Sequence, residues 1–351
     1  MSTSSSGSPS AEAADPVRRP GRTPIDVAVV GLGRAGVELA RAVAADPFLR
    51  LAAGVVQSPE KVDVDVGRLT GTAETGVLAT ADLDAVLRDP AIGCVLHAGL
   101  GDPSDVAAVL GRCADHGKDA ITVSGLVHPL TALGPVGYER LRSRAIDGGA
   151  RLVGTGVNPG FVLDVLPVVW GSMVTQVRHV RAVRVSEIGA WGDGILAELG
   201  VGRPVAEVVD SSPLSVAESL AVIVDGLGLD VDAIDEQVRP IAADRRREHG
   251  TRAVDVGRCA GFRRLATATL RGTVVAEIEW VALLGMTADD EHQETASLRI
   301  EGESVVEAEA RGTFFGDPYP STAARAVHSI GPLAAMPPGL YRPDQLAVSV
   351  R

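Results

Sequence analysis

The stretch IDVAVVGLGRAGVELARAVAADPFLRLAAGVV, residues 25–56, decides the fold of this 351-residue chain. Its first six residues are mostly apolar and β-branched, as in a buried strand, and residues 31–36 have the spacing GxGxxG. A helix follows until Asp46 and Pro47 end it, and 51–56 is predicted to be a second strand. A glycine motif between a strand and a helix predicts a dinucleotide-binding βαβ unit.

Strands and helices continue to alternate as far as residue 156. The sequence predicts further helices at 82–88, 103–116 and 136–148, and further strands at 93–99, 119–125 and 150–156. This alternation favours the α/β class, with a Rossmann-type doubly wound parallel sheet.

A different pattern begins after Pro159. Long β-prone runs, such as FRRLATATLRGTVVAEIEWVALLG at 262–285, predict an α+β domain with a mostly antiparallel sheet. SVAESLAVIVDGLGLDVDAIDEQ at 215–237 is expected to be an inserted helical segment, and the chain is expected to end with a helix and a Pro-rich extended tail. We therefore divide the chain into a disordered tail, a dinucleotide-binding domain, a substrate and oligomerisation domain and a C-terminal segment, at 1–23, 24–156, 157–315 and 316–351.

Composition excludes several classes of partner. The formal net charge is −12 with a pI near 5.1, and basic residues are scattered, which disfavours a nucleic-acid surface. No apolar run reaches the length of a membrane span. Cys94, Cys113 and Cys259 are odd in number and lack CxxC spacing, which argues against disulfides and zinc and fits the cytoplasm. Dispersed histidines give no metal motif.

Each glycine of the motif has an expected role. Gly31 permits the tight turn, Gly33 lets the pyrophosphate approach the backbone, and Gly36 lets the helix pack closely on the strand. The helix N-terminus, which includes Ala35, favours the phosphate charge. The alternative is a βα turn whose glycines serve only the backbone.

The residues after the second strand predict which nucleotide is bound. NAD-preferring folds carry an acid at the end of that strand, whereas this chain has Gln57 and Ser58 there. Arg34, Ser58 and Lys61 together can accept a 2′-phosphate, which favours NADP and leaves NAD possible. The alternative is that Arg34 and Lys61 are solvated surface charges.

TGVNPGFVLDVLP, residues 155–167, follows the last strand of the first domain and so lies at the carboxyl edge of its sheet, where ligands of such folds bind. Pro159 holds Asn158 out of the helical region, and Gly160 is expected to leave room for a ligand. Asn158 then offers a donor and an acceptor to a nicotinamide ring or a reacting carbon. Alternatively, Asn158 caps the helix FVLDVLPVVW.

His97, Ala98 and Gly99 end another strand at the same edge and are expected to contact the cofactor. For His97 a satisfied buried histidine is an equal alternative. We call residues 155–160, between the two domains, the hinge. Asp164, one turn into the helix after the hinge, is expected to favour the N-terminal dipole.

In its hinge and several other segments, the chain resembles the 2,4-diaminopentanoate dehydrogenases and the related native amine dehydrogenases. The N-terminal domain of these enzymes is similar to that of dihydrodipicolinate reductase. The resemblance covers most of residues 25–345. It is carried by GTGVNPGFVLDVLP, GLGRAG, VVQSPEKVDVDVGRL, AESLAVIVDGLG and GDPYPSTAARAVHSIGPLAAMPPGL. It implies hydride transfer between a nicotinamide cofactor and an imine carbon in an interdomain cleft, to which the C-terminal segment returns.

The chain departs from the family where a paired acid is expected. TVSGLVHP at 122–129 has Ser124 and Gly125 at those positions, so the catalytic carboxylate is absent. SSPLSVAES at 211–219 also lacks a family histidine, and His328 stands where an asparagine is expected. Activation of ammonia needs a positioned acid or base, whereas hydride delivery to a preformed C=N bond demands less.

Replacements for that acid can be named. His128 lies in the altered loop, and histidine is a common general acid or base, although a partly exposed loop histidine beside Pro129 is an equal alternative. Glu187, in SEIGAWGDG with Trp191 and Asp193, is the best replacement acid, although most strand-end acids are solvated. Ser124 is expected to form a hydrogen bond with the nicotinamide or the substrate; the alternative is a small polar turn residue.

Tyr319 and His328 belong to the returning C-terminal element, where a packing role is the simpler expectation for both. The resulting hypothesis is an NADP-dependent oxidoreductase that acts on a small-molecule imine or amine. A carbonyl reductase that takes a ketone is one alternative, and a cofactor-binding sensor without turnover is another. A homodimer is expected by analogy with such folds.

Overall fold

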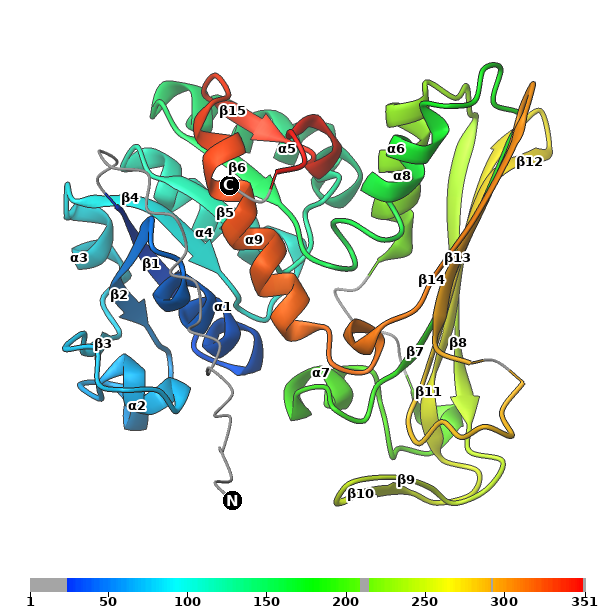
Figure 1. Cartoon of the computed structure of the whole chain (residues 1–351), viewed down its shortest axis with the longest axis horizontal. Helices are drawn as coiled ribbons and strands as arrows, with labels where there is room; N and C mark the ends of the chain where they lie inside the picture. Colours follow the sequence, from blue (N-terminus) through cyan, green and yellow to red (C-terminus); the bar gives the residue numbers. More distant parts are fainter. Residues whose placement is uncertain (1–23, 209–214, 292, 350–351) are drawn as a thin grey trace, which may run out of the picture.

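A parallel sheet of seven strands forms the first domain of the computed structural model, which describes residues 24–208, 215–291 and 293–349 (Figure 1). The tail expected at 1–23 lies outside the described residues. All neighbouring strands in this sheet are parallel, in the order β15-β6-β5-β4-β1-β2-β3. The strands are β1 Ile25–Val30, β2 Leu49–Val55, β3 Ala79–Thr80, β4 Ile92–His97, β5 Asp119–Thr122, β6 Arg151–Gly154 and β15 Gly339–Tyr341.

Helices cover both faces of this sheet, which confirms the predicted doubly wound architecture (Figure 1). One face packs against α1 and α9, and the other against α3, α4 and α5. The helices are α1 Arg34–Ala45, α2 Val66–Thr70, α3 Leu83–Arg88, α4 Pro103–Asp115, α5 Pro129–Asp147 and α9 Tyr319–Ala334, with a 3₁₀ turn η1 at Pro59–Lys61. A kink at Gly134 divides α5, and the predicted helix at 136–148 corresponds to its second part.

The second domain is built on a six-stranded sheet, in the order β14-β13-β7-β12-β11-β8. Every pairing is antiparallel except that of β7 with β12, so the mostly antiparallel sheet is confirmed. The strands are β7 His179–Glu187, β8 Ala233–Ala242, β11 Cys259–Leu270, β12 Thr273–Leu283, β13 Thr295–Glu301 and β14 Val305–Ala310. The smaller elements are β9 Arg247–His249, β10 Arg252–Val254, α6 Val165–Gly171, α7 Asp193–Glu198, α8 Val216–Leu227, η2 Val205–Glu207, η3 Thr313–Phe315 and η4 Pro343–Gln345.

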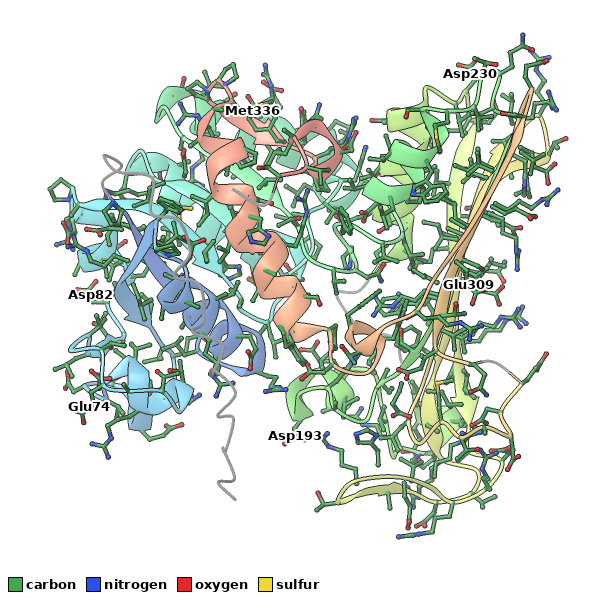
Figure 2. The ribbon with its side chains drawn as sticks, viewed as in Figure 1. Glu74, Asp82, Asp193, Asp230, Glu309 and Met336 are labelled. Atoms are coloured by element: carbon green, nitrogen blue, oxygen red, sulfur yellow. The ribbon has the colours of Figure 1, made fainter. Side chains whose placement is uncertain are left out.

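The two faces of the second sheet differ in polarity. Helix α8 buries Leu220 and Ile223 against the inner face, which is turned toward the first domain (Figure 1). The outer face is charged: Arg181 of β7 pairs with Glu277 and Glu279 of β12. Figure 2 shows Glu309 on the side of the sheet away from the first domain. Apolar side chains therefore gather on the inner side of the sheet.

One element prediction is wrong. The segment expected to be helical at 215–237 is helical only to Leu227, because Gly228 takes a left-handed conformation (φ 65°) that ends α8, and β8 then begins at Ala233. The C-terminal tail adds a strand that the sequence did not predict, since β15 pairs in parallel with β6. Within the described part of the chain, every helix is too short or too polar to span a bilayer.

Candidate active site

The glycine turn between β1 and α1 has two filled positions and one open position. A Cβ at Gly31, where φ is +88°, would lie 2.8 Å from the Ala98 carbonyl oxygen. A Cβ at Gly36 would lie 1.6 Å from the Gly31 oxygen, so the chain's own backbone fills both positions. A Cβ at Gly33 would meet nothing within 4 Å. Gly33 is the N-cap of α1, so this open backbone fits a pyrophosphate beside the positive end of the helix.

Arg34 follows the open glycine and contacts the C-terminal segment. Its guanidinium lies 2.7 Å from the Asp317 carboxylate and 3.4 Å from that of Glu38, and its centre lies 5.3 Å from the centroid of the Tyr319 ring. These contacts join the glycine turn to the start of α9. Because the Arg34 guanidinium is paired with Asp317, it is not free to bind a 2′-phosphate as the sequence predicts.

Lys61 and Ser58 lie beside the same turn. The Lys61 ammonium donates to the Leu32 carbonyl oxygen at 2.8 Å, which holds η1 against the glycine turn. An ammonium has three donors, so others remain for a ligand. Ser58 is half-buried at the start of η1, directly after β2, where an NAD-preferring fold has an acid.

His97, at the end of β4, is buried and positions two neighbouring loops. Its Nε2 accepts from the Gly99 N–H at 3.2 Å, so the neutral ring carries its proton on Nδ1, which donates to Thr122 Oγ1 at 3.0 Å. The Ser124 N–H donates to the same hydroxyl. Burial lowers the pKa of His97 to about 4, which keeps the ring neutral near pH 7. His97 is thus a satisfied buried histidine that shapes the loops carrying Ala98, Gly99 and Ser124.

A cleft of about 150 Å³ lies between the two domains. Its first wall comes from the carboxyl edge of the parallel sheet, and its second from β7, β12 and the α7 region. The start of α9 closes one side. The lining residues are Ala35, Ala98, Gly99, Leu100, Val123, Ser124, Asn158, Pro159, Arg184, Trp191, Ile195, Trp280, Pro318, Tyr319 and Thr322.

Asn158 lies at the centre of the hinge, before a cis peptide bond to Pro159. Its Oδ1 atom is buried without a hydrogen-bond partner in the described part of the chain, although the residue lines the cleft. Such an atom is costly to bury unless a ligand donates to it. The alternative role as helix cap is wrong, because Asp164 is the N-cap of α6 and accepts from the Val165 N–H at 2.7 Å.

The role expected for Gly160 is also wrong. A Cβ there would lie 2.2 Å from the Gly156 nitrogen, and φ is +121°, so the space beside Gly160 is filled by the hinge backbone and holds no ligand. Its N–H donates to the Asp164 carboxylate at 2.7 Å, which also accepts from the Ser219 hydroxyl. Asp164 is fully buried, and it ties the hinge to α6 and α8.

His128 and Glu187 lie apart from the cleft-lining residues. His128 caps α5, where its Nδ1 accepts from the Thr131 N–H and its Nε2 lies 3.1 Å from the Asp225 carboxylate, in a different pocket. The Glu187 carboxylate accepts backbone N–H groups of residues 189, 285 and 286 at 2.6–3.0 Å. These contacts explain both residues as loop anchors, and they do not favour the catalytic roles expected for them.

The remaining candidate site residues fall into two groups, those that line the cleft and those that do not. The Asp193 side chain is 91% exposed and pairs with Arg252, and Figure 2 shows Asp193 near the lower end of the gap between the domains. His328 is half-buried and does not line the cleft, whereas Trp191 and Tyr319 do line it. The described residues contain no group of three or more His, Cys, Asp or Glu side chains placed to hold a metal ion.

Sequence reasoning named Trp191 on the second wall of the cleft but missed Arg184 and Trp280. Arg184 of β7 and Trp280 of β12 face each other across a parallel strand pair, with the guanidinium centre 5.3 Å from the ring centroid. The rings of Trp280 and Trp191 lie 5.9 Å apart. A strand register that joins residues almost a hundred positions apart is not visible in the sequence. An arginine within an apolar strand was the available signal.

Comparisons with known proteins bear on the family and the fold of this chain. A family model described as the 2,4-diaminopentanoate dehydrogenase C-terminal domain matches residues 161–350, and one described as the dihydrodipicolinate reductase N-terminus matches residues 25–124. An amine dehydrogenase of Streptomyces virginiae is 30% identical over 239 residues, covering 63% of each chain. A 2,4-diaminopentanoate dehydrogenase of Acetoanaerobium sticklandii is 28% identical over 127 residues, covering 33% of this chain and 36% of the relative.

The matched part of the chain thus spans under two thirds of the length of either relative. Among solved structures, an amine dehydrogenase from Mycobacterium smegmatis has the same fold. Its TM-score is 0.82 at 23% identity, covering 93% of this chain and 97% of that one.

Proposed function

Because this chain belongs to the 2,4-diaminopentanoate dehydrogenase family, we propose that it is a nicotinamide-dependent oxidoreductase that transfers hydride to the carbon of a C=N bond, or oxidises the corresponding amine. One observation carries the proposal. A single cleft joins the sheet edge beside the open glycine turn to Asn158, whose buried Oδ1 atom has no hydrogen-bond partner among the described residues. The hydrogen-bond donor that this oxygen lacks is the kind of group that a nicotinamide amide or an iminium nitrogen supplies.

The nucleotide would lie along the carboxyl edge of the parallel sheet, with its pyrophosphate at Gly33. Lys61 and Ser58 support the phosphorylated form, since no acid for the unmodified ribose stands at the end of β2 itself. Arg34 would join them only by exchanging Asp317 for the phosphate. When bound, a reduced nicotinamide supplies the hydride and its oxidised form accepts one.

The chain's own residues orient the reactants and exclude water. Asn158 and Ser124 supply polar groups on the nucleotide side of the cleft. Trp191, Trp280 and Ile195 form an apolar wall on the opposite side, which favours transfer of a hydride in a dry site. The substrate therefore lies between a polar sheet edge and an aromatic wall.

Reduction of a neutral imine also requires a proton for the nitrogen, and Tyr319 can deliver it. Of the described residues that line the cleft, Tyr319 and Arg184 are the ionisable ones. The Tyr319 oxygen accepts the Gly192 N–H at 3.0 Å, which leaves its own proton to donate. Burial raises the pKa of Tyr319 despite that hydrogen bond, so the phenol is protonated at neutral pH. A preformed iminium already carries its proton and needs hydride alone.

The same geometry favours two further functions. A Tyr319 hydroxyl can protonate an oxygen as well as a nitrogen, which is the basis for a carbonyl reductase. The lack of an Asp, Glu or His among the described lining residues is the basis for a cofactor-binding sensor without turnover. Both alternatives retain the nucleotide site.

Measuring the oxidation of NADPH distinguishes these three functions. The purified protein is mixed with cyclic imines, with ketones plus ammonia, and with ketones alone. We expect consumption with cyclic imines above all, and Gly33→Ala as the control should lower it when NADPH is below saturation. Turnover with ketones alone would replace the proposal by the carbonyl reductase. Nucleotide binding without any turnover would replace it by the sensor.

A further inference from the structure

Arg34 lies where the glycine turn, the C-terminal segment and the second domain meet. Its guanidinium pairs with Asp317 at 2.7 Å, and its centre lies 5.3 Å from the centroid of the Tyr319 ring. Asp317 also accepts the Tyr319 backbone N–H at 3.3 Å, so Arg34 contacts the tyrosine both directly and through this carboxylate. A Cβ at Gly192 would lie 3.5 Å from Arg34 Cβ and 3.6 Å from the Tyr319 oxygen. The second domain therefore packs against both side chains.

Of these two side chains, only that of Tyr319 reaches the cleft. Tyr319 is a lining residue and Arg34 is not. The phenol oxygen is held by the Gly192 N–H at 3.0 Å, and the ring is held on its face by the guanidinium. Held at both places, the phenol has little freedom to turn away from the cleft. Arg34 can therefore affect the reactants through Tyr319 without touching them.

The charge of Arg34 also acts on the phenol. Burial raises the pKa of Tyr319, whereas the Gly192 N–H and the cation of Arg34 oppose the increase. The charged groups around the phenol come from the elements packed against it: Arg34 of α1, Asp317 before α9, Arg252 of β10 and Arg184 of β7. Because a nearby cation favours the ionised form of an acid, Arg34 makes the buried phenol a better proton donor.

Binding of a 2′-phosphate by Arg34 would remove these contacts. The guanidinium would have to leave both the Asp317 carboxylate and the Tyr319 ring. Lys61 can bind the same phosphate without breaking an ion pair, since its ammonium is bonded to the Leu32 carbonyl oxygen and retains other donors. The contacts of Arg34 therefore fit the tyrosine better than the nucleotide.

We propose that Arg34 is a positioning residue for proton transfer: it remains on Asp317 and Tyr319 when a nucleotide is bound, and it holds the phenol toward the cleft. In the step that it serves, the carbon of a neutral C=N bond gains a hydride and the nitrogen gains the phenol proton. The phenol O–H bond breaks, and the phenolate then regains a proton from water. Reduced nicotinamide supplies the hydride when bound. This inference rests on the proposed function.

Steady-state kinetics with two substrates at saturating NADPH test this role. A neutral cyclic imine needs the phenol proton, whereas its N-alkylated iminium does not. Arg34→Met should lower kcat for the neutral imine by about tenfold or more, the scale expected for a misplaced catalytic group, with little change in KM. Reduction of the iminium and the affinity for NADPH should change far less. Arg34→Lys should fall between this variant and the wild type, because it keeps the charge but loses the planar face over the ring.

Fluorine NMR gives a readout that needs no turnover. The chain has 3 tyrosines, so protein labelled with ring-fluorinated tyrosine shows few signals, and that of Tyr319 is the one lost in Tyr319→Phe. The pH midpoint of this signal should be higher in Arg34→Met than in the wild type, because a cation that opposes the effect of burial is removed. The difference should persist with NADPH bound, since Arg34 is proposed to stay in place.

Arg41→Met is the matched control. Arg41 lies on the same helix, has the same 41% side-chain exposure as Arg34 and pairs with the same Glu38. Its guanidinium also donates to the Thr70 carbonyl oxygen. Arg41→Met should match the wild type in both kinetics and titration. Because Arg34 is partly exposed, Arg34→Met is expected to fold; if its Tm falls well below that of Arg41→Met, Arg34→Gln takes its place.

The outcomes are distinct. An unshifted titration midpoint in Arg34→Met, or an equal loss of kcat with both substrates, would overturn the proposal. So would a loss of NADPH affinity with NADH affinity retained, which would assign Arg34 to the 2′-phosphate. A shifted midpoint in a protein that binds nucleotide but reduces no imine would overturn the proposed function alone and leave Arg34 as the residue that positions the phenol.

Discussion

At the scale of single residues, Gly33 and Gly36 occupy opposite steric environments within one motif. A Cβ at Gly36 would overlap the Gly31 carbonyl oxygen, whereas a Cβ at Gly33 would enter open space. One glycine therefore serves the fold and the other leaves room for a ligand. The spacing GxGxxG predicted these roles because each follows from the path of a βαβ backbone.

Alanine at each position should separate these two roles. Gly36→Ala is expected to lower the free energy of unfolding by about 2 kcal/mol or more, because backbone must move to admit the Cβ. Gly33→Ala should leave the free energy of unfolding within about 0.5 kcal/mol of the wild type and weaken NADPH binding at least about tenfold. Urea unfolding and a nucleotide titration measure both. Undiminished NADPH affinity in Gly33→Ala would place the pyrophosphate elsewhere.

Tyr319 is predicted to be the proton donor. Tyr319→Phe should lower kcat for a neutral cyclic imine by about a hundredfold or more, in the range of general acid catalysis, with little change in KM. An N-alkylated iminium needs no proton, so its reduction should be nearly unaffected. Because the pKa of Tyr319 is raised, the wild-type rate with the neutral imine should stay level through neutral pH and fall only above about pH 10. Equal losses with both substrates would indicate a packing role.

The errors of sequence reasoning about single residues have a common cause. Arg184 and Trp280 meet only after β7 and β12 pair, and no local pattern records that pairing. His128 and Glu187 were expected in the cleft because of their chemistry and nearby motifs, whereas their hydrogen-bond partners come from distant segments. The position of the hinge residue Asn158 was predictable from the sequence, because a strand end and a proline specify it locally.

At the scale of elements, α5, α6 and α8 meet beside the hinge through buried carboxylates. Glu218 of α8 is 4% exposed and accepts the His128 N–H at the start of α5. Asp164 at the start of α6 accepts from Ser219 of α8. Burial raises the pKa of Glu218 to about 7, and the charges of Asp164 and Glu236 add to this, while backbone N–H donors oppose it.

This raised pKa makes stability depend on pH. Between the ordinary glutamate pKa near 4.5 and about 7, the folded protein holds a proton on Glu218 that the unfolded chain has lost, so stability falls as the pH rises through this window. Glu218→Gln keeps the shape and the acceptor oxygen but cannot ionise. Relative to the wild type it should be more stable by roughly 1 to 3 kcal/mol at pH 8 and nearly equal at pH 4.5. Urea unfolding at the two pH values checks this, and a variant that is equally destabilised at both would contradict it.

Helices and strands were predictable where local chemistry defines their ends. Asp102 caps α4 before Pro103, and the helix predicted at 103–116 agrees closely with the observed one. The strand β8 was missed because it follows α8 directly, although Gly228 marked the end of the helix. The strand β15 has three residues, and its structure depends on the edge of β6 rather than on its own sequence.

At the scale of the whole molecule, the chain crosses from the first domain to the second at the hinge and returns through α9. This helix packs against α1 and brings Tyr319 and Thr322 to the cleft, while β15 extends the first sheet (Figure 1). The fold class and the family were predicted correctly from the sequence, because alternation and motif spacing are properties of the chain alone. Only the assembled structure shows which side chains face each other across the cleft.

Titration of NADPH and NADH into the apoprotein tests the central claim most directly, with the fluorescence of Trp191 and Trp280 in the cleft as the signal. We expect saturable quenching by both nucleotides, tighter binding of NADPH, and a loss of at least about tenfold in Gly33→Ala. If neither nucleotide binds the wild-type protein, the cleft is not a nicotinamide site and the account is wrong.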